Sequence, residues 1–499
     1  MSTLESEGGF FEQVQGKINP VVVEHYYSHR LEKSNQSFAY LLQVMEAHVV
    51  MLAECKIIPQ NIAKKLLVAI EELNGKTPEL DPKLEDLYLN FEAILTAKLG
   101  VEVSSYLPVA RSRNDVEAAM WRIELREKLF QMADSILALV NVLHHRSEET
   151  ADYLFPGYTY RQQAQPVTLG HYLLGIAAAL LRDVDRVIDC VSRFNYGPLG
   201  AAALAGTGYG INRELTSRLL GFQGVWDHTQ DAVASADYML ESANTAVLNL
   251  NTLARLAGDI IQWCATEIGF ADLPNDLIDS SSIMPQKRNP VICATVRAHA
   301  RLVAGRYAGI CAASSVEFEA SRDVTVAWED VLECIRIANG MCRISEAYTS
   351  GLIFKREDME NSLYKGFSNA TELADSLVIE GNLPFRAAHK IVGGAIAELY
   401  EQGKGQDCLN YELLNTWSIK VTGASLPISP EQVEQAKDFR VGVERRNCVG
   451  ATSQKEIARM LSEQEQKAKD LAITLTEIRS KWQAANEELH RKAQTIINC

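Results

Sequence analysis

Apolar residues recur at helical spacing in three long stretches of the chain. The first stretch runs from Asp231 to Ile268 and contains Val233, Leu240, Val247, Leu250, Leu253, Ile260 and Cys264. It predicts one helix about 55 Å long, at 1.5 Å per residue. The second begins after Arg113 and contains Val116, Met120, Ile123, Phe130, Leu137 and Val140. The third runs from Pro290 through Arg343 with small residues interspersed, and several such helices side by side predict a bundle.

Turn-forming segments separate these helices. They read SSYLPVARSRND, LFPGYTY, NYGPLGAAALAGTGYG and DLPNDLIDSSSIMPQKRNP, each rich in Gly, Pro, Ser or Asn. Prolines are otherwise sparse, and their absence between Pro108 and Pro156 favours an unbroken helix there. If the bundle brings the segments together, helix N-termini converge, which suits an anionic ligand.

Shorter helical units flank the bundle. We predict an all-α fold with an N-terminal helical domain (1–111), a central long-helix bundle (112–365) and a C-terminal helical domain (366–499). The C-terminal domain is expected to end in an amphipathic helix whose stripe comprises Leu471, Leu475, Ile478, Trp482, Ala485 and Leu489. Docking of this helix on its own subunit is favoured over binding to a partner.

Composition narrows the ligand classes. The chain of 499 residues carries 49 basic and 64 acidic residues, a net charge of -15, which argues against nucleic acid or an anionic membrane as partner. An acidic ligand therefore needs a local basic pocket. The ten cysteines form no CxxC pair, so we expect no disulfide framework, no metal and no cofactor. The acidic start MSTLESEGGFFEQVQ and the absence of a long apolar run predict a cytoplasmic protein.

The segment SSSIMPQKRNP, Ser280 to Pro290, concentrates the groups that could carry chemistry. Lys287 and Asn289 could hold a carboxylate while backbone donors stabilise an oxyanion. On composition alone, a solvated Ser-rich loop that ends in an Asn-Pro turn is the favoured interpretation.

Several segments resemble one enzyme superfamily. SSSIMPQKRNP is similar to the signature Gly-Ser-Ser-x-Met-Pro-x-Lys-x-Asn-Pro of fumarases, aspartases and argininosuccinate lyases. ARSRND (110–115) and PGYTYRQQAQPVTLGH (156–171) resemble the other site-forming regions of that superfamily. GPLGAAALAGT, NATELADSLV and PFRAAHKIVG resemble argininosuccinate lyase in particular, and the similarity extends from about Ser37 to Leu461.

This resemblance implies a homotetramer that pools its long helices in a multi-chain core, with each active site built from three chains. It also implies anti elimination across a succinyl group: a serine alkoxide removes the Cβ proton, an aci-carboxylate forms, and fumarate is released. The base maps to Ser281, because Ser280 takes the usual Gly position. A nearby Lys287 ammonium, together with loop amides, would lower the pKa of the Ser281 hydroxyl.

The same mapping implies the remaining site residues. Those expected to bind substrate are Ser112, Arg113, Asn114, Thr159, Gln162, Ser282, Met284 and Asn289. Helix capping is an alternative role for the SRND segment, and the two roles are compatible.

The chain departs from the family at a proton relay. Tyr160 stands where the family has His, and Ala294 stands where it has the Glu that pairs with that His. The joint loss suggests a site rebuilt around another proton donor or around none, since an alkyl amine can depart already protonated. A catalytic Tyr160 and a packing Tyr160 are about equally supported.

The chain also departs where argininosuccinate lyases hold arginine. Their SxAYDR reads SFAYLL here, so Ser37 remains and Leu41 replaces the acid; their STYNKDLQEDK becomes FEASRDVTVAWED around Ser321 to Asp330. A guanidinium that lacks this carboxylate partner loses about 1.5–3 kcal/mol of binding free energy. Arg322 and Arg161 are candidate cations for an acidic tail.

We therefore expect reversible cleavage of an N-substituted aspartate into fumarate and an amine other than arginine. An aminopolycarboxylate such as ethylenediamine-N,N'-disuccinate (EDDS) is favoured. One alternative is a genuine argininosuccinate lyase. Another is a non-catalytic structural relative like the lens crystallins, which the intact Ser281, Lys287 and Asn289 oppose.

Overall fold

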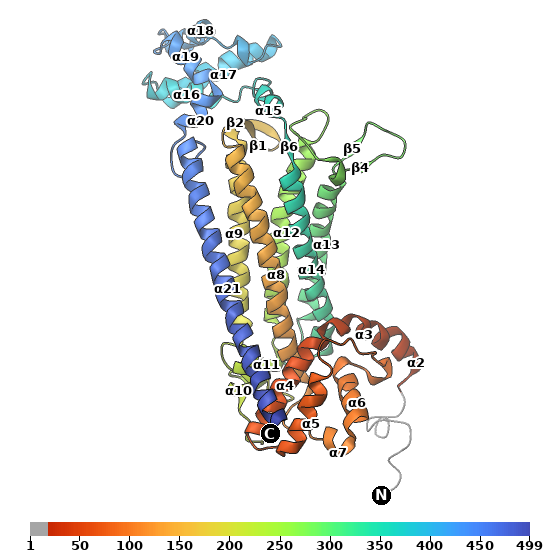
Figure 1. The fold of residues 1–499 in the computed structure, drawn as a ribbon. Helices are drawn as coiled ribbons and strands as arrows, with labels where there is room; N and C mark the ends of the chain where they lie inside the picture. The colour runs from red at the N-terminus through yellow and green to blue at the C-terminus, as the bar shows by residue number, and fades with distance from the viewer. Residues whose placement is uncertain (1–17) are drawn as a thin grey trace.

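A computed structural model describes residues 18–499, and MSTLESEGGFFEQVQ lies outside that range. The described chain is built on a bundle of long up-and-down helices (Figure 1), which confirms the predicted all-α class. The bundle comprises α8 (Arg113–Glu149), α9 (Leu169–Phe194), α12 (Asp237–Trp263), α13 (Val291–Ala313) and α14 (Arg322–Gly351). Helix α8 packs against α9 and α14, and α12 packs against α9, α13 and α14.

The helices expected at 231–268 and 290–343 are each broken in two, so these two predictions were wrong. The first is split at Ser235 into α11 (Thr229–Ala234) and α12, because the backbone of Ser235 is extended and its hydroxyl accepts a hydrogen bond from Arg122 at 3.1 Å. The 27 residues of α12 span about 40 Å rather than 55 Å. The second ends at Ala313 and resumes at Arg322, where Ser321 is extended and caps α14.

Shorter helices lie at the two ends of the bundle. At one end they are α2 (Pro20–Val22), the π-helical turn η1 (Val23–Tyr27), α3 (Ser28–Ser34), η2 (Asn35–Ser37), α4 (Phe38–Glu54), α5 (Gln60–Glu71), η3 (Pro82–Leu84), α6 (Leu87–Leu99), α7 (Val101–Ser104) and α10 (Arg213–Leu219). At the other end they are η4 (Asn275–Leu277), α15 (Arg356–Leu363), α16 (Ala370–Ile379), α17 (Phe385–Glu401), η5 (Gln406–Cys408), α18 (Tyr411–Thr422), α19 (Pro430–Lys437) and α20 (Phe439–Arg445).

Three two-stranded sheets in the described chain lie at this second end. They are the hairpin β1 (Leu154–Thr159) with β2 (Gln162–Thr168), the pair β3 (Ala271–Asp272) with β6 (Ile353–Phe354), and the pair β4 (Asp279–Ser280) with β5 (Arg288–Asn289). The turn of the hairpin consists of Tyr160 and Arg161, both at positive φ, as tight two-residue hairpin turns require.

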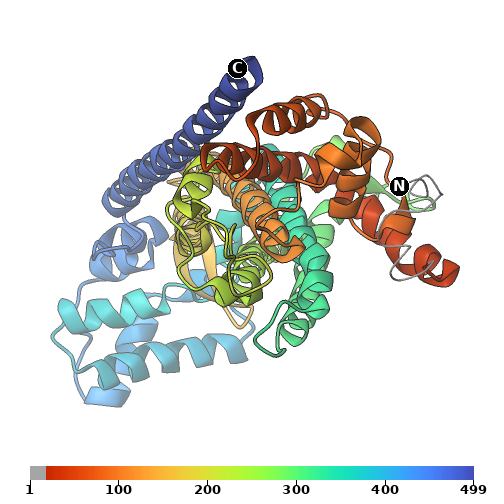
Figure 2. The same ribbon diagram turned by 90° about the horizontal axis from the view of Figure 1, so that it is seen from below.

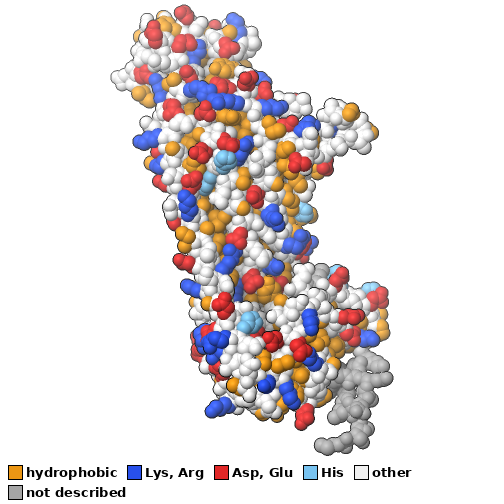
Figure 3. Space-filling model, in the orientation of Figure 1, with side chains coloured by type: hydrophobic (Ala, Val, Ile, Leu, Met, Phe, Trp, Pro, Cys, Tyr) orange, Lys and Arg blue, Asp and Glu red, His pale blue; other side chains and the backbone are white. Residues whose placement is uncertain are grey.

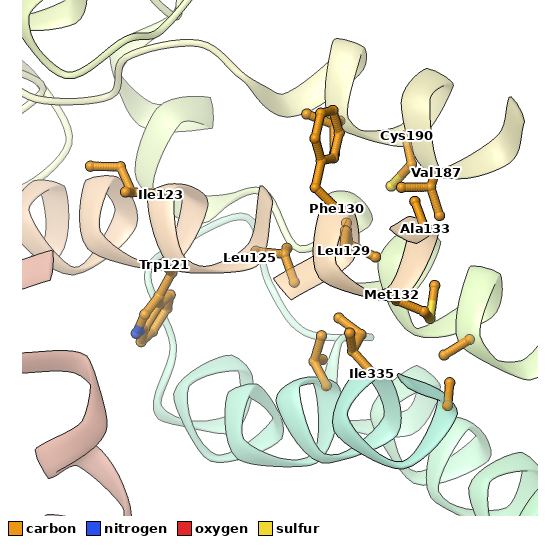
Figure 4. Close-up of a cluster of buried hydrophobic side chains, with 14 of the residues drawn as sticks. Trp121, Ile123, Leu125, Leu129, Phe130, Met132, Ala133, Val187, Cys190 and Ile335 are labelled. Carbon is orange, nitrogen blue, oxygen red and sulfur yellow. The ribbon is translucent and has the colours of Figure 1, made fainter. Parts of the chain in front are cut away.

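Helix α21 (Gln454–Asn498) runs back along the whole bundle (Figure 1; Figure 2 gives the view from below). It contacts α9 and α8 and then reaches α4 and α5, so it docks on its own subunit as favoured. Its Leu475 and Leu489 belong to the same hydrophobic core as the bundle, part of which is shown in Figure 4. A second core, from Leu373 to Ala436, holds the C-terminal helices together, and the predicted domain limits remain predictions.

Among residues 18–499, no helix is both long and apolar enough to cross a lipid bilayer.

We expect Leu475→Ala to lower the free energy of unfolding by about 2–5 kcal/mol, because Leu475 is only 1% exposed between α21 and the bundle. Chemical denaturation followed by circular dichroism measures the change. Ile473→Ala is the matched control on the same helix, since Ile473 is 55% exposed and should cost far less. Equal losses in the two variants would contradict the docking of α21.

Candidate active site

The signature loop, residues 281–287, is held at its base by a two-stranded stem. Asp279 pairs with Asn289 and Ser280 pairs with Arg288 across β4 and β5. The Asn289 side chain also donates to the Asp279 carbonyl at 3.2 Å, and Arg288 forms an ion pair with Asp272 at 3.2 Å. The stem thus fixes both ends of a loop that projects from the end of the bundle (Figure 1).

The Ser281 hydroxyl oxygen accepts two backbone amides of its own loop. It accepts the amide N–H of Met284 at 3.1 Å and that of Ile283 at 3.4 Å. Amide dipoles that point at an oxygen stabilise negative charge on it, as a serine base requires. Lys287 follows in the loop and is exposed, and within the described chain its side chain makes no hydrogen bond or ion pair with Ser281. Ser282 and Met284 are exposed in the same loop.

The residues mapped to the second region sit at the tip of the β1–β2 hairpin. Thr159 and Gln162 are exposed on either side of its turn, and the Tyr160 side chain is 100% exposed. Tyr160 therefore packs against nothing within its own chain. Arg161 donates a hydrogen bond to Gln262 at the end of α12, which ties the hairpin tip to the bundle.

Ser112 begins α8 with a capping box. Its hydroxyl accepts the Asn114 amide at 3.4 Å, and its own amide donates to Asp115 at 2.9 Å. Ser112 thus has the expected capping role, which is compatible with a role in substrate binding.

Asp115 was missed by the sequence analysis, although the spacing S-x-x-D indicates a capping box. Its second oxygen accepts the amides of Gly200 at 2.8 Å and Ala202 at 2.9 Å, which ties the loop after α9 to the start of α8. The side chain is completely buried, and burial raises the pKa of Asp115 to about 6. Asp115 is a positioning residue for its neighbours Arg113 and Asn114.

Arg113 and Asn114 line a cavity of about 260 Å³, which we call the succinyl cavity after the group that these two residues are expected to bind. Arg113 donates to Asp86 at 2.8 Å, and the Asn114 amide donates to the Ala203 carbonyl at 3.1 Å. The cavity is also lined by Arg122 and Arg322. Asp86, Glu117 and Glu319 line it as well, so the cavity is mixed in charge and is not the purely basic pocket expected for an acidic ligand.

Arg122 is held in this wall without a carboxylate. It is 1% exposed, and its guanidinium stacks over Trp226 at 4.6 Å and over Tyr238 at 4.4 Å. It donates to the Ser235 hydroxyl and the Ala118 carbonyl. Cation–π contacts and neutral acceptors leave its positive charge uncancelled by a direct ion pair.

A second cavity of about 660 Å³ adjoins the first and shares Glu117, Trp121 and Thr325 with it. Trp121 stacks on Trp328 with ring centroids 5.1 Å apart. Ser37 also lines this cavity and donates to the buried Glu124 at 2.6 Å.

Two positions that differ from the family sit away from these cavities. Leu41 is 1% exposed in the hydrophobic core, so it presents nothing to a ligand. Ala294 lies in the first turn of α13, close to the signature loop. The segment FEASRDVTVAWED, which also differs from the family, does reach a cavity. Its residues Ser321, Arg322 and Thr325 line the succinyl cavity.

The predicted site residues lie at opposite ends of one chain. Helix α8 separates Arg113 from the hairpin that carries Thr159, and its 37 residues span about 55 Å. The stem β4–β5, which carries the Ser281 loop, lies at the same end of the bundle as the hairpin, far from the start of α8 (Figure 1). A single chain therefore does not bring Ser281 to the succinyl cavity.

No metal-binding cluster of three or more His, Cys, Asp or Glu side chains occurs among residues 18–499. All ten cysteines are free thiols.

Comparison with known proteins identifies the family. Residues 22–305 match the family described as Lyase, and residues 367–444 match the argininosuccinate lyase C-terminal family. The argininosuccinate lyase of Methanothrix thermoacetophila is 35% identical over 89% of this chain and 90% of its own length. The chain belongs to the argininosuccinate lyase-like branch of the fumarase/aspartase superfamily.

Among solved structures, EDDS lyase in complex with formate is similar to this chain, with a TM-score of 0.86 and 29% identity over 97% of this chain and 96% of that one. The argininosuccinate lyase of Archaeoglobus fulgidus is 33% identical over 94% of this chain and 95% of its own length. The protein is a fumarate-releasing carbon–nitrogen lyase, which disfavours the crystallin-like alternative.

We expect Asp115→Asn to destabilise the protein by about 1–3 kcal/mol, because asparagine has one accepting oxygen and cannot accept the Ser112 amide on one side and both loop amides on the other. It should also raise the KM for fumarate in the addition direction, since Arg113 and Asn114 lose their fixed helix start. Denaturation and initial-rate kinetics measure the two effects. Asp134→Asn, on the exposed side of the same helix, is the control that should change neither. An unchanged KM in Asp115→Asn would contradict the positioning role.

Proposed function

We propose that the protein reversibly cleaves an N-substituted aspartate into fumarate and an amine, with Ser281 as the base. The observation that carries the proposal is the position of the Ser281 oxygen, which accepts two backbone amides at the tip of a fixed stem. These donors favour the alkoxide that must remove the Cβ proton. The signature loop of this lyase family supplies the chemical context.

The remaining site residues then bind different parts of the dicarboxylate. Lys287 and Asn289 stabilise the carboxylate next to the Cβ carbon as it becomes an aci-carboxylate, because charge-assisted hydrogen bonds strengthen as charge accumulates. Arg113 and Asn114 hold the other end of the succinyl group. Ser112, Thr159, Gln162, Ser282 and Met284 complete its surroundings, and Tyr160 remains a candidate proton donor.

We propose that the sites form in a homotetramer. The 55 Å between Arg113 and the hairpin end requires that different copies supply the parts of one site. Helix α13 supports this, because its buried stripe is narrow while Leu302 on another face is 62% exposed. Ala304, Gly305, Ala308 and Gly309 are exposed near Leu302 and would allow close packing of helices from other copies.

We favour an aminopolycarboxylate such as EDDS over argininosuccinate as the substrate. The buried Leu41 cannot hold a guanidinium, and the exposed Arg322 at the succinyl cavity offers a cation to a further carboxylate. The similarity to EDDS lyase over nearly the whole chain supports this choice. Argininosuccinate is the second candidate, supported by relatives that carry the argininosuccinate lyase name.

We expect Ser281→Ala to lower kcat for fumarate formation at least 1000-fold while leaving assembly unchanged, because the variant loses the base but no core packing. Fumarate absorbance with EDDS or argininosuccinate as substrate measures the rate. Ser280→Gly, which restores the residue usual in the family, is the control and should retain activity. Activity retained in Ser281→Ala would refute the role of Ser281 as the base.

We expect two inactive variants to restore each other when mixed. After dissociation and reassociation, Ser281→Ala with Asn114→Ala should regain measurable activity, because some sites then combine an intact loop with an intact succinyl cavity. Ser281→Ala with Lys287→Ala is the control that should stay inactive, since both changes lie in the same loop. No gain with the first pair would contradict sites shared between chains.

A further inference from the structure

One face of α8 leads from the succinyl cavity into the larger cavity. Arg113, Glu117, Trp121 and Glu124 follow one another at spacings of four, four and three residues, so their side chains lie along one face of the helix. Arg113 lines the succinyl cavity, Glu124 lines the larger one, and Glu117 and Trp121 line both. A ligand that extends from Arg113 into the larger cavity must pass Glu117 first.

Glu117 has a free acceptor at this junction. Its Oε1 accepts a hydrogen bond from Arg30 of α3 at 3.4 Å, and no hydrogen bond within residues 18–499 reaches its Oε2. The other acids near Arg113 are less suited: Asp86 binds Arg113 at 2.8 Å and caps α6, and Glu85 forms an ion pair with Arg113 at 3.4 Å. Glu319 lines the succinyl cavity but not the larger one. Glu117 is therefore the carboxylate best placed to receive a new cation in this part of the site.

The charged groups around Glu117 come from several elements. Asp86 faces it from the start of α6, Arg30 from α3, Arg322 from α14 and Arg113 from its own helix, and Tyr238 of α12 lies close by. Burial, followed by the charge of Asp86, raises the pKa of Glu117 to about 6. Glu117 is then mainly a carboxylate at pH 7 and becomes neutral as the pH falls through about 6.

We propose that Glu117 binds the protonated nitrogen of the substrate, and that the substrate is therefore an N-alkyl aspartate whose nitrogen is an ammonium ion. The inference rests on the proposed function. While the two carboxylates of the succinyl group are held by Arg113, Asn114 and the signature loop, the nitrogen lies beside Glu117. Substrates whose leaving atom is uncharged, such as N-aryl aspartates or malate, lack this interaction.

An ammonium also explains how the reaction proceeds without the His and Glu that Tyr160 and Ala294 replace. Ser281 removes the Cβ proton, the electron pair of that C–H bond forms the new C=C bond, and the C–N bond breaks. The C–N electron pair stays on the nitrogen, which leaves as a neutral amine because it was protonated beforehand. No proton donor to the leaving group is needed in this step.

The body of the amine continues into the larger cavity. Its volume of about 660 Å³ is typical of sites for small organic ligands. The stacked Trp121 and Trp328 supply an aromatic wall beside Glu117, and such a wall attracts both hydrocarbon and cationic groups.

The test compares Glu117→Gln with the wild type in the full-length protein. With EDDS or N-butylaspartate, whichever the wild type cleaves, kcat/KM should fall about 10- to 100-fold, as expected for loss of one charge-assisted hydrogen bond. The inhibition constant of fumarate, which has no nitrogen, should change less than about threefold. Glu117→Asp should recover part of the loss.

The pH profile gives a second readout. Binding needs the ionised carboxylate, so wild-type kcat/KM should fall as the pH drops below about 6. In Glu117→Gln this acid limb should become shallower, because Asp115, whose pKa burial also raises to about 6, is then left to titrate there. Glu127→Gln is the matched control on α8: Glu127 accepts a hydrogen bond from Tyr40 at 2.8 Å and lines neither cavity, so both the rate and the acid limb should stay as in the wild type.

Three outcomes would overturn the inference. In Glu117→Gln, an unchanged kcat/KM with an unchanged acid limb would show that the carboxylate does not bind the nitrogen. An equal loss of affinity for fumarate would show that Glu117 only supports the fold through Arg30. If the wild type cleaves N-phenylaspartate as fast as it cleaves N-butylaspartate, the substrate nitrogen need not be an ammonium ion and the inference is refuted. If the wild type releases fumarate from none of these aspartates, the proposed function itself fails, and the inference fails with it.

Discussion

The length and burial of α8 determine how this molecule is organised. The helix packs on α9, α14, α21 and α4, and most of its 37 residues are covered by them. Figure 4 shows its apolar side chains, among them Leu129 and Met132, packed with residues of neighbouring helices. A rigid rod of about 55 Å fixes the succinyl cavity at one end of the chain and the hairpin at the other. The site proposed above can therefore be completed only where chains meet, so the proposed assembly follows from the same packing that stabilises the fold.

The succinyl cavity does not share the acidic character of the whole chain, because arginines and acids balance there. The net charge is -15, and on the face shown in Figure 3 acidic and basic side chains are interspersed over the full length. Inside the cavity, the positive charges of Arg113, Arg122 and Arg322 are matched by the acids Asp86, Glu117 and Glu319. Arg122 keeps its charge in a buried wall through aromatic rings and neutral acceptors, which leaves it able to attract a dicarboxylate. Glu117 introduces one negative charge where the nitrogen of an aspartate derivative would lie.

The two halves of the site are built by different physical means. The Ser281 loop depends on local structure, since a two-stranded stem and loop amides fix the oxygen with few contacts to the rest of the chain. The succinyl cavity depends on long-range contacts, because Asp115 joins the start of α8 to Gly200 and Ala202, about 85 residues further along the chain. The position of Tyr160 fits this division. At the hairpin tip its side chain packs against nothing in its own chain, so it is free to contact another chain.

The sequence by itself determined the all-α class, the long-helix bundle and the lyase family, because helical periodicity and the loop SSSIMPQKRNP are local properties of the chain. It also pointed to Ser281, Arg113 and Asn114. It misjudged the breaks at Ser235 and Ser321, because apolar spacing continues across a turn whose position is set by long-range contacts such as that from Arg122 to Ser235. Only the tertiary structure decided that Leu41 is buried, that Asp115 positions the cavity, and that Glu117 stands between two cavities. Each of these facts depends on which distant helices pack together, and spacing along one helix does not encode that.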